Sequence, residues 1–347
     1  ISDDGLLKAG AVERVVDVLS QSVDQKIFCE IKENPTIGCV EGALNVYRNF
    51  GCDSIIGLGG GSVLDAGKAL RVVTNQEHPL LSYLQDPSLI SPDVAPYATI
   101  PTTAGTGAEV TFGGGIHASE NSPPLGLRSP HLRPDIAFCD PDLTISLPPH
   151  LTAATGMDAL VHCIEGYLSV NTNRPAEAIA LDGIRRVSSF VLRASSDGHD
   201  MDARSNMMMA ALEGGMSIYM GLGPVHALSM AFGDSPLHHG TLVTVCTPAV
   251  MRVFNGLPGE KLDRIANAMG LAAGVSPGDR IAEEIVRLNQ ELGLPGSVKE
   301  MQYNGASFPE VVKAAHASHF NNTSPKKLTI DNYEKIVSEL LCLNDIY

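Results

Sequence analysis

Short apolar runs alternate with amphipathic stretches through the first part of the chain. Residues 53–58, 97–101 and 135–139 are compact apolar runs bounded by turn-forming residues, a pattern typical of buried strands. Between them, residues 42–50 and 63–73 repeat apolar positions at helical spacing. Strands and helices alternating at this spacing predict an α/β unit in which helices cover a parallel sheet.

The pattern changes after Leu147-Pro148-Pro149, beyond which almost every segment has helical periodicity. Thr152 follows the prolines at a position typical of a helix N-cap, because its hydroxyl can accept from a first-turn amide. Helices are predicted over residues 152–169, 175–194, 201–220, 224–232, 241–254, 259–269, 278–292 and 308–319.

Two domains therefore follow from the pattern: an α/β domain over residues 1–149 and an all-helical domain over residues 150–347. Within the first, residues 114–134 are rich in Gly, Ser and Pro and predict a hairpin or loop. The chain begins with Ile1-Ser2-Asp3, which has the pattern of a strand end, so we expect a further part of the domain to precede it.

Composition excludes several classes of protein. The chain has 347 residues with 24 basic and 39 acidic side chains, a net charge of −15, which argues against a nucleic-acid or anionic-membrane partner. No apolar run approaches the roughly 20 residues of a membrane helix. The seven cysteines are odd in number and form no CxxC pair, which argues against disulfides and structural zinc and favours a cytoplasmic protein.

Two glycine- and hydroxyl-rich loops each follow a predicted strand. Residues 57–65 (Gly-Leu-Gly-Gly-Gly-Ser-Val-Leu-Asp) open a helix, whose N-terminal amides and partial positive charge suit a phosphate. The loop departs from the usual dinucleotide fingerprint, because Ser62 replaces its third glycine. Residues 101–111 form the second loop, which is also rich in glycines and hydroxyls. Two such loops on neighbouring strands indicate a nucleotide site. The alternative is a pair of tight turns without a ligand.

Asp158 and His162 are spaced i, i+4 in a helix of mostly apolar and small residues. They share one helical face, which suits two ligands of one metal ion; a simple hydrogen-bonded pair is the alternative. His226, His238 and His239 supply further imidazoles before later helices. One carboxylate with two or three imidazoles favours Fe(II), Zn(II) or Co(II) over Mg²⁺ or Ca²⁺.

These motifs, in this order, resemble the iron-containing (group III) alcohol dehydrogenase family, which includes lactaldehyde reductase and, more distantly, glycerol dehydrogenase. The matching stretches are Gly59-Gly60-Gly61-Ser62…Asp65, residues 101–109, residues 156–165 and His239-Gly240. The resemblance covers essentially the whole chain. It implies an N-terminal Rossmann-like nucleotide-binding α/β domain and an all-α metal-binding domain in a dehydroquinate synthase-like fold.

The resemblance also implies site residues. A divalent metal, Fe(II) or in some members Zn(II), would bind Asp158, His162, His226 and His239. Cofactor contacts would come from Asp3, Asn34, Gly60, Gly61, Ser62, Asp65, Thr102, Thr103 and Thr106. Asp3 would accept from the ribose 2′-hydroxyl and repel a 2′-phosphate, so NAD is expected over NADP.

The expected activity is hydride transfer between a small or medium alcohol or aldehyde and NAD(H), by a homodimer. His238 is the candidate proton relay, because a neutral imidazole near pH 7 suits that role, or else a partner of a ligand. Family members commonly carry another histidine four residues after the one at His226, and this chain has Met230 there. The alternatives are a hydroxyacid–oxoacid transhydrogenase, a maleylacetate reductase-like enzyme, a dehydroquinate synthase-like lyase and a non-catalytic member of the fold.

Overall fold

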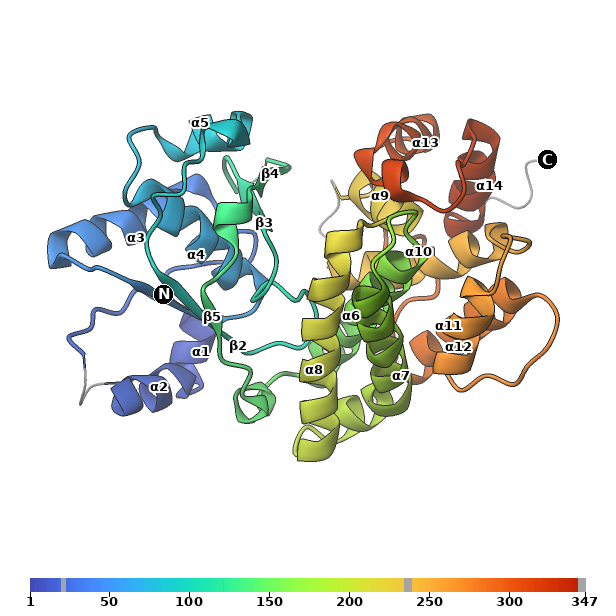
Figure 1. The fold of residues 1–347 in the computed structure, drawn as a ribbon, viewed down its shortest axis with the longest axis horizontal. Coiled ribbons are helices and arrows are strands. Elements are labelled where there is room, and N and C mark those ends of the chain that lie inside the picture. The colour runs from blue at the N-terminus through green and yellow to red at the C-terminus, as the bar shows by residue number, and fades with distance from the viewer. Residues whose placement is uncertain (20–22, 121, 234–238, 343–347) are drawn as a thin grey trace. The chain divides into compact units, whose positions relative to one another are not determined.

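The computed structural model describes residues 1–19, 23–120, 122–233 and 239–342. It divides into two compact units (Figure 1). The first unit comprises Ile1–Thr103 and Gly107–Ser146, and the second comprises Ala104–Thr106 and Leu147–Tyr347. Each unit has its own buried apolar cluster, so each can be described by itself.

The first unit is built on a parallel sheet of order β1-β2-β5, with β1 at Ile55–Gly59, β2 at Tyr97–Pro101 and β5 at Ile136–Ala137. In register, Gly59 lies opposite Pro101, so both strands end at the same edge. Ile1 extends this hydrogen bonding on the other side of β1, because the Leu58 amide donates to its carbonyl at 3.0 Å. The predicted parallel sheet is confirmed, although β5 is shorter than the apolar run that predicted it.

Helices accompany this sheet and bury their apolar faces. The central one is α4, which packs against β1, β2 and β3 and is buried along most of its length. The helices of the first unit are α1 (Asp4–Lys8), α2 (Ala11–Leu19), α3 (Ile37–Phe50), α4 (Gly61–Val73) and α5 (Leu80–Gln85), with short 3₁₀ turns η1 (Pro87–Leu89), η2 (Pro130–Leu132) and η3 (Pro141–Thr144).

A two-stranded antiparallel hairpin follows the second loop. It pairs β3 (Gly113–His117) with β4 (Pro124–Arg128) and packs β3 on α4. The hairpin predicted within residues 114–134 is therefore confirmed. Its inner residues Ile116 and Leu127 are almost fully buried, which fixes the hairpin on the core of the first unit.

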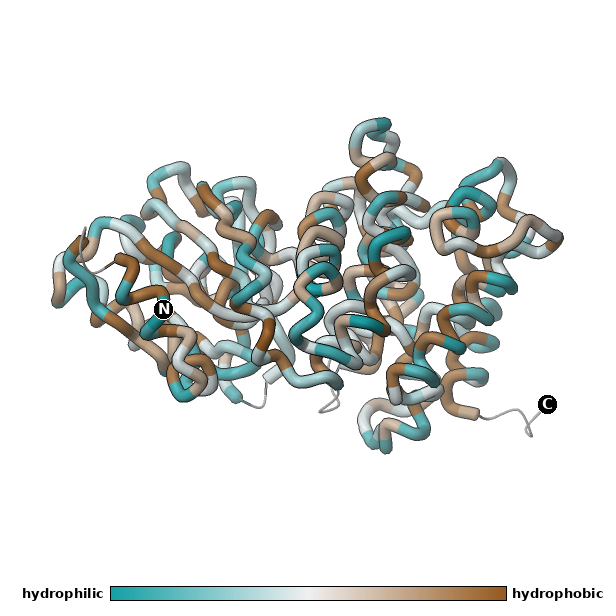
Figure 2. Tube along the Cα trace, turned by 90° about the horizontal axis from the view of Figure 1, so that it is seen from below, coloured by the Kyte–Doolittle hydropathy of each residue, from teal (hydrophilic) through white to brown (hydrophobic). Residues whose placement is uncertain are grey.

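All the regular elements in the described residues of the second unit are helices. Figure 2 shows hydrophobic and hydrophilic residues alternating along the helices, as expected where one face packs inward. The elements are α6 (Pro149–Leu168), α7 (Arg174–Ser196), α8 (Met201–Ser217), η4 (Ile218–Met220), α9 (Pro224–Ala231), α10 (His239–Val253), α11 (Lys261–Ala268), α12 (Pro277–Glu291), α13 (Phe308–Ala317), η5 (His319–Thr323) and α14 (Ile330–Leu340).

Helix α6 runs through the middle of this unit and packs against α7, α8 and α10. It is buried from Thr152 to Leu168, and apart from the face that carries Asp158, His162 and Glu165 its residues are mostly apolar or small. The prediction of Thr152 as its N-cap is wrong. The helix begins one turn earlier, with Pro148 as N-cap and Pro149 at the first position, where a fixed φ and a missing N–H suit a helix start. The Thr152 hydroxyl instead accepts from Arg204 at 2.8 Å.

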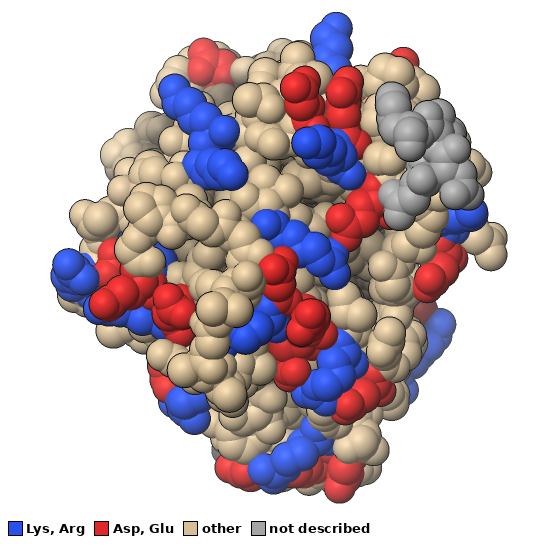
Figure 3. All heavy atoms as spheres, turned by 90° about the vertical axis from the view of Figure 1, so that its right-hand side faces the viewer, with Lys and Arg blue, Asp and Glu red and all other residues tan. Residues whose placement is uncertain are grey.

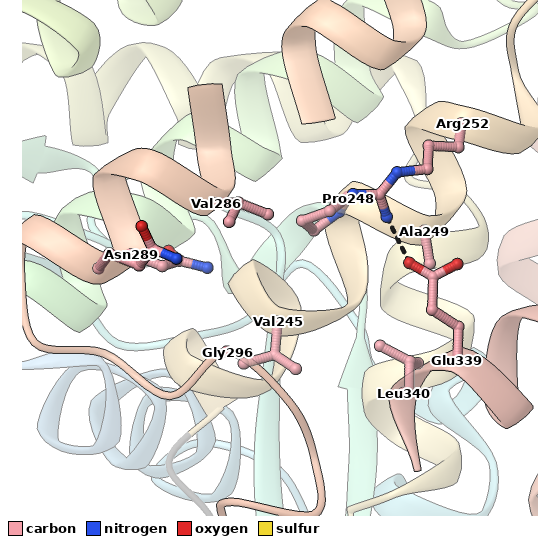
Figure 4. Close-up of a pocket in the computed structure, with 10 residues that line it drawn as sticks. Val245, Pro248, Ala249, Arg252, Val286, Asn289, Gly296, Glu339 and Leu340 are labelled. Atoms are coloured by element: carbon pink, nitrogen blue, oxygen red, sulfur yellow. Dashed lines mark hydrogen bonds and ion pairs between the residues drawn. The ribbon is translucent and has the colours of Figure 1, made fainter. Parts of the chain in front are cut away.

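Helix α10 contains an internal proline that the tertiary structure accommodates. Pro248 has no N–H, so the carbonyl of Thr244 loses its helical donor. The buried amide of Asn289 on α12 donates to that carbonyl at 3.5 Å and accepts from the Thr244 hydroxyl at 2.8 Å. Both Pro248 and Asn289 line a pocket between α10, α12 and α14, beside the ion pair of Arg252 and Glu339 (Figure 4).

The surface carries both charge signs. Figure 3 shows acidic and basic side chains interspersed on the face that it views, a distribution typical of a solvated surface. Among the described helices, none is long and apolar enough to cross a membrane.

Candidate metal centre and dinucleotide loops

One face of α6 carries three ionisable residues into the buried interior of the second unit. Asp158, His162 and Glu165 are 2%, 4% and 3% exposed. Their spacing of i, i+4 and i+7 places them along the same side of the helix. Isolated charged or polar groups are costly at such depth, so each requires a partner or a ligand.

Glu165 holds a second element against this face. Its carboxylate accepts from the backbone amides of Gly223 at 3.0 Å and Val225 at 2.7 Å, at the start of α9. It also lies 2.6 Å from Nδ1 of His226, to which that ring donates. The carboxylate therefore fixes the helix start and the ring orientation together, leaving Nε2 of His226 free to face away from it.

Four potential ligand atoms converge beside Asp158. One atom each from Asp158, His162, His226 and His239 lies within 4.8 Å of all the others. Nε2 of His162 is 3.6 Å and Nε2 of His239 is 3.9 Å from Oδ1 of Asp158. Bonds of about 2.1 Å to a tetrahedral metal would place ligand atoms about 3.4 Å apart, so small side-chain shifts would suffice to bind one ion.

The chemistry of this donor set fits a divalent transition metal. Nε2 of His226 is buried and has no hydrogen-bond partner among the described residues, as expected of a nitrogen that a metal would complete. Burial lowers the pKa of His162 below its ordinary value, against the opposing effect of the Asp158 carboxylate. A lowered pKa favours the neutral imidazole, which is the form that binds metal.

His239 differs from the other three residues in its surroundings. It is the first residue of α10 and its side chain is 45% exposed, whereas the side chains of Asp158, His162 and His226 are almost fully buried. Its ring centroid is 5.5 Å from that of His226. The cluster is therefore closed on the α6 side and open on the side of His239. His238, the candidate proton relay, lies outside the described residues.

The contact between Glu165 and His226 is not predicted from the sequence, in which Glu165 is only the last residue of the stretch 156–165. Its i+3 spacing from His162 would have been the available signal, because a ligating histidine usually donates its other nitrogen to a carboxylate or carbonyl. The sequence could not show that the ring served by Glu165 belongs to His226, sixty-one positions later.

The two glycine- and hydroxyl-rich loops meet at one edge of the parallel sheet. The Thr102 amide donates to the carbonyl of Gly59 at 3.1 Å. A Cβ added to Gly60 would lie 3.1 Å from the Thr103 side chain, a tight contact that shows how closely the two loops approach. This juxtaposition is the one expected of a nucleotide site in an open α/β sheet.

The first loop ends in an open helix terminus. Gly60 is the N-cap of α4 and has no side chain to bond the first-turn amides of the helix. Gly60, Gly61 and Ser62 are each partly exposed, so these amides are accessible to an anion. Thr102 is buried and Thr103 is partly exposed.

The remaining predicted cofactor residues have varied surroundings. Asp3 follows the segment paired with β1, and its Oδ1 accepts from the Leu6 amide at 2.9 Å as the N-cap of α1. Asn34 is exposed and has a left-handed backbone with φ of 57°. Thr106 belongs to the second unit, where Gly105 packs tightly on Thr155 of α6.

Asp65 is already engaged within the first unit. Oδ1 accepts from Nζ of Lys68 at 3.0 Å, and Oδ2 accepts from the amide of Gly115 at 3.0 Å. Its side chain is 22% exposed. Oδ2 therefore ties α4 to the hairpin, whereas Oδ1 pairs with a residue of α4 itself.

Comparisons with known proteins identify the family of this chain. Residues 1–141 match the family model described as iron-containing alcohol dehydrogenase, and residues 152–341 match that of the Fe-containing alcohol dehydrogenase family, C-terminal. The 4-hydroxybutyrate dehydrogenase of Cupriavidus necator is 38% identical over 352 residues, spanning 98% of this chain and 91% of that protein. The lactaldehyde reductase of Escherichia coli (strain K12) is 32% identical over 342 residues, spanning 96% and 88%.

A solved structure has the same fold as this chain. A crystal structure of 1,3-propanediol oxidoreductase superposes with a TM-score of 0.92 at 30% identity, covering 98% of this chain and 91% of that one. The expected fold class, an α/β nucleotide-binding unit followed by a helical metal-binding unit, is thereby confirmed. On these matches the chain belongs to the iron-containing alcohol dehydrogenase family and is an oxidoreductase of alcohols and aldehydes.

Proposed function

We propose that the chain interconverts short primary alcohols and aldehydes with NAD(H), at a divalent metal held by Asp158, His162, His226 and His239. The observation that carries the proposal is the convergence of these four donors within 4.8 Å, three of them buried. Iron is the first candidate because three imidazoles and one carboxylate suit it, and zinc is the second.

Residues of this chain would set the protonation and the orientation of the metal ligands. When bound, a divalent ion supplies a Lewis acid for the substrate oxygen. Glu165 keeps the proton of His226 on Nδ1 and so presents Nε2 as a lone-pair donor. Burial around His162 holds that imidazole neutral, and the open side at His239 leaves room for a substrate.

The loop amides would bind the dinucleotide. Amides of Gly61 and Ser62 at the start of α4 suit the pyrophosphate, and the hydroxyls of Thr102 and Thr103 border the same edge. Asp3, on the segment beside β1, would accept from the ribose hydroxyl, which supports NAD over NADP. Asn34 and Thr106 remain proposed contacts, and His238 remains a proposed proton relay.

The substrate class is proposed from the relatives. Those compared are named for 4-hydroxybutyrate, lactaldehyde and 1,3-propanediol, all short chains that carry a second oxygen-bearing group. We therefore expect short oxygen-bearing aldehydes such as succinic semialdehyde, lactaldehyde and 3-hydroxypropanal to be reduced faster than butanal. A homodimer in the cytoplasm is part of the same proposal.

The decisive experiment combines metal analysis with an NADH assay. His162→Ala removes one buried ligand and should lower both bound metal and turnover, the latter by roughly a thousandfold or more, because the centre then has three donors. His150→Ala is the matched control, since His150 is an exposed residue of the same helix. Elemental analysis and NADH oxidation over the aldehyde panel measure both.

Several outcomes contradict the proposal. A His162→Ala protein that is free of metal and fully active would mean that the reaction does not require the metal. Turnover without net change in NADH, with nicotinamide retained through purification, would instead establish a transhydrogenase.

A further inference from the structure

A buried ion pair lies in α4 just behind the glycine loop. Lys68 is completely buried, and its ammonium donates to Oδ1 of Asp65 at 3.0 Å, to the Thr111 hydroxyl at 2.8 Å and to the Gly113 carbonyl at 2.7 Å. All three ammonium hydrogens are thereby used. The pair joins the first turns of α4 to the beginning of β3.

The partner carboxylate is fixed as tightly. Oδ2 of Asp65 accepts from the Gly115 amide, and a Cβ added to Gly114 would lie 2.9 Å from Cγ of Asp65. Residues 111–115 thus wrap around the Lys68–Asp65 pair, and a side chain at position 114 would force Asp65 to shift. Four hydrogen bonds and one close approach specify where the start of α4 lies relative to the hairpin.

Stability alone is a poor reason for such a pair. Removing two charges from water costs as much as their attraction returns, so apolar replacements are often as stable. A directed ion pair does, however, define one geometry more sharply than apolar packing does. The element so defined is the helix whose first-turn amides follow Gly60.

We propose that Lys68 is a positioning residue for the dinucleotide: it holds Asp65 and the start of α4 so that the loop amides face the cofactor phosphates. This inference rests on the proposed function, because it presupposes NAD(H) at the loop. In this proposal, Asp65 connects the hairpin to α4 and so fixes the position of the helix start.

Arg71 provides a matched comparison within the same helix. It is also a buried cation, and it donates to the Ala95 carbonyl at 3.0 Å, to the Arg133 carbonyl and to Asp135 at 2.9 Å. Its partners lie on segments other than the hairpin strands and the loop. Loss of Arg71 should therefore destabilise the first unit without displacing the loop amides.

The test compares Lys68→Met with Arg71→Met in the full chain. NADH binding is measured by the change in NADH fluorescence, and Tm is measured beside it. We expect Lys68→Met to weaken NADH binding roughly tenfold or more, as for a site displaced by a fraction of an ångström. Arg71→Met should lower Tm about as much as Lys68→Met does. The Kd of Arg71→Met for NADH should stay within about threefold of the wild-type value.

A second variant covers the case in which Lys68→Met does not fold. Gly114→Ala keeps both charges but pushes a methyl group against Asp65, and it should also weaken NADH binding with metal content unchanged. Wild-type affinity in either folded variant, or equal weakening in Arg71→Met, overturns the positioning role. A wild-type protein that fails to bind NADH overturns the proposed function instead.

Discussion

The two proposed sites are formed by different kinds of chemical groups. In the first unit, the edge proposed to bind phosphate consists of backbone amides and hydroxyls from two loops, and the nearby charges of Asp65 and Lys68 pair with each other. In the second, the centre consists of ionisable side chains from α6, α9 and α10, brought together in a buried interior. One site is made by the course of the main chain, and the other by side chains that meet.

This difference decides how each site tolerates change. A site of amides persists as long as the loop keeps its course, so residues behind the loop matter more than those on its surface. A site of buried imidazoles and a carboxylate needs its metal, because a polar atom such as Nε2 of His226 otherwise has no partner among the described residues. Metal binding should therefore stabilise the second unit directly.

The largest effect expected in the comparison is that of Glu165→Gln. The substitution removes the charge that holds Nδ1 of His226, and loss of such a partner typically weakens metal binding about 10–100-fold. NADH binding should be unchanged, since the first unit is untouched. Metal titration with a competing chelator, and NADH fluorescence, measure the two effects.

A matched control for Glu165→Gln is Glu177→Gln, at a buried carboxylate of α7 that pairs with Arg174. It should leave metal affinity unaltered. Wild-type metal affinity in Glu165→Gln would contradict the role of Glu165 at the metal site. Loss of NADH binding in the same variant would contradict the independence of the two sites.

The next effect concerns Asp3. Asp3→Asn keeps the cap on α1, because asparagine caps helices about as well as aspartate, while it removes the negative charge. We expect the ratio of kcat/KM with NADP to that with NAD to rise roughly tenfold, the value of one hydrogen bond to a charged group. Asp4→Asn, which removes a neighbouring exposed charge, is the control. An unaltered cofactor ratio in Asp3→Asn would place the ribose elsewhere.

The smallest effect is a change in pH-dependent stability. Burial, followed by the neighbouring Asp182, raises the pKa of Glu213 to about 7. A raised carboxyl pKa means that the folded state holds its proton longer, so this stabilising contribution is complete below pH about 4.5 and is lost as pH rises through about 7.

Glu213→Gln should therefore be more stable than wild type at pH 8 by about 1–2 kcal/mol, a figure reduced for partial solvent screening, with a smaller gain at pH 5.5. Urea unfolding at the two pH values measures this. Glu283→Gln, at an exposed position of α12, should show no such difference. A gain that is equal at both pH values would mean that Glu213 does not titrate in this range.

Much of the fold was predictable because its elements are locally encoded. The strand Tyr97–Pro101 coincides with its apolar run, and the helices of the second unit agree with their periodicity to within a few residues at most ends. Errors arose where chain ends or tertiary contacts decided. The sequence predicts Thr152 as a cap although Pro149 already begins the helix, and it does not predict α14, at Ile330–Leu340.

The sequence by itself determined the glycine loop and the i, i+4 pair of Asp158 and His162, because both are contiguous in the chain and follow from local geometry. Only the tertiary structure decided that Glu165 serves the ring of His226 and that Lys68 ties Asp65 to residues 111–115. These contacts join residues more than forty positions apart. Local periodicity carries no information about such pairs, since burial and packing bring them together only when the units fold.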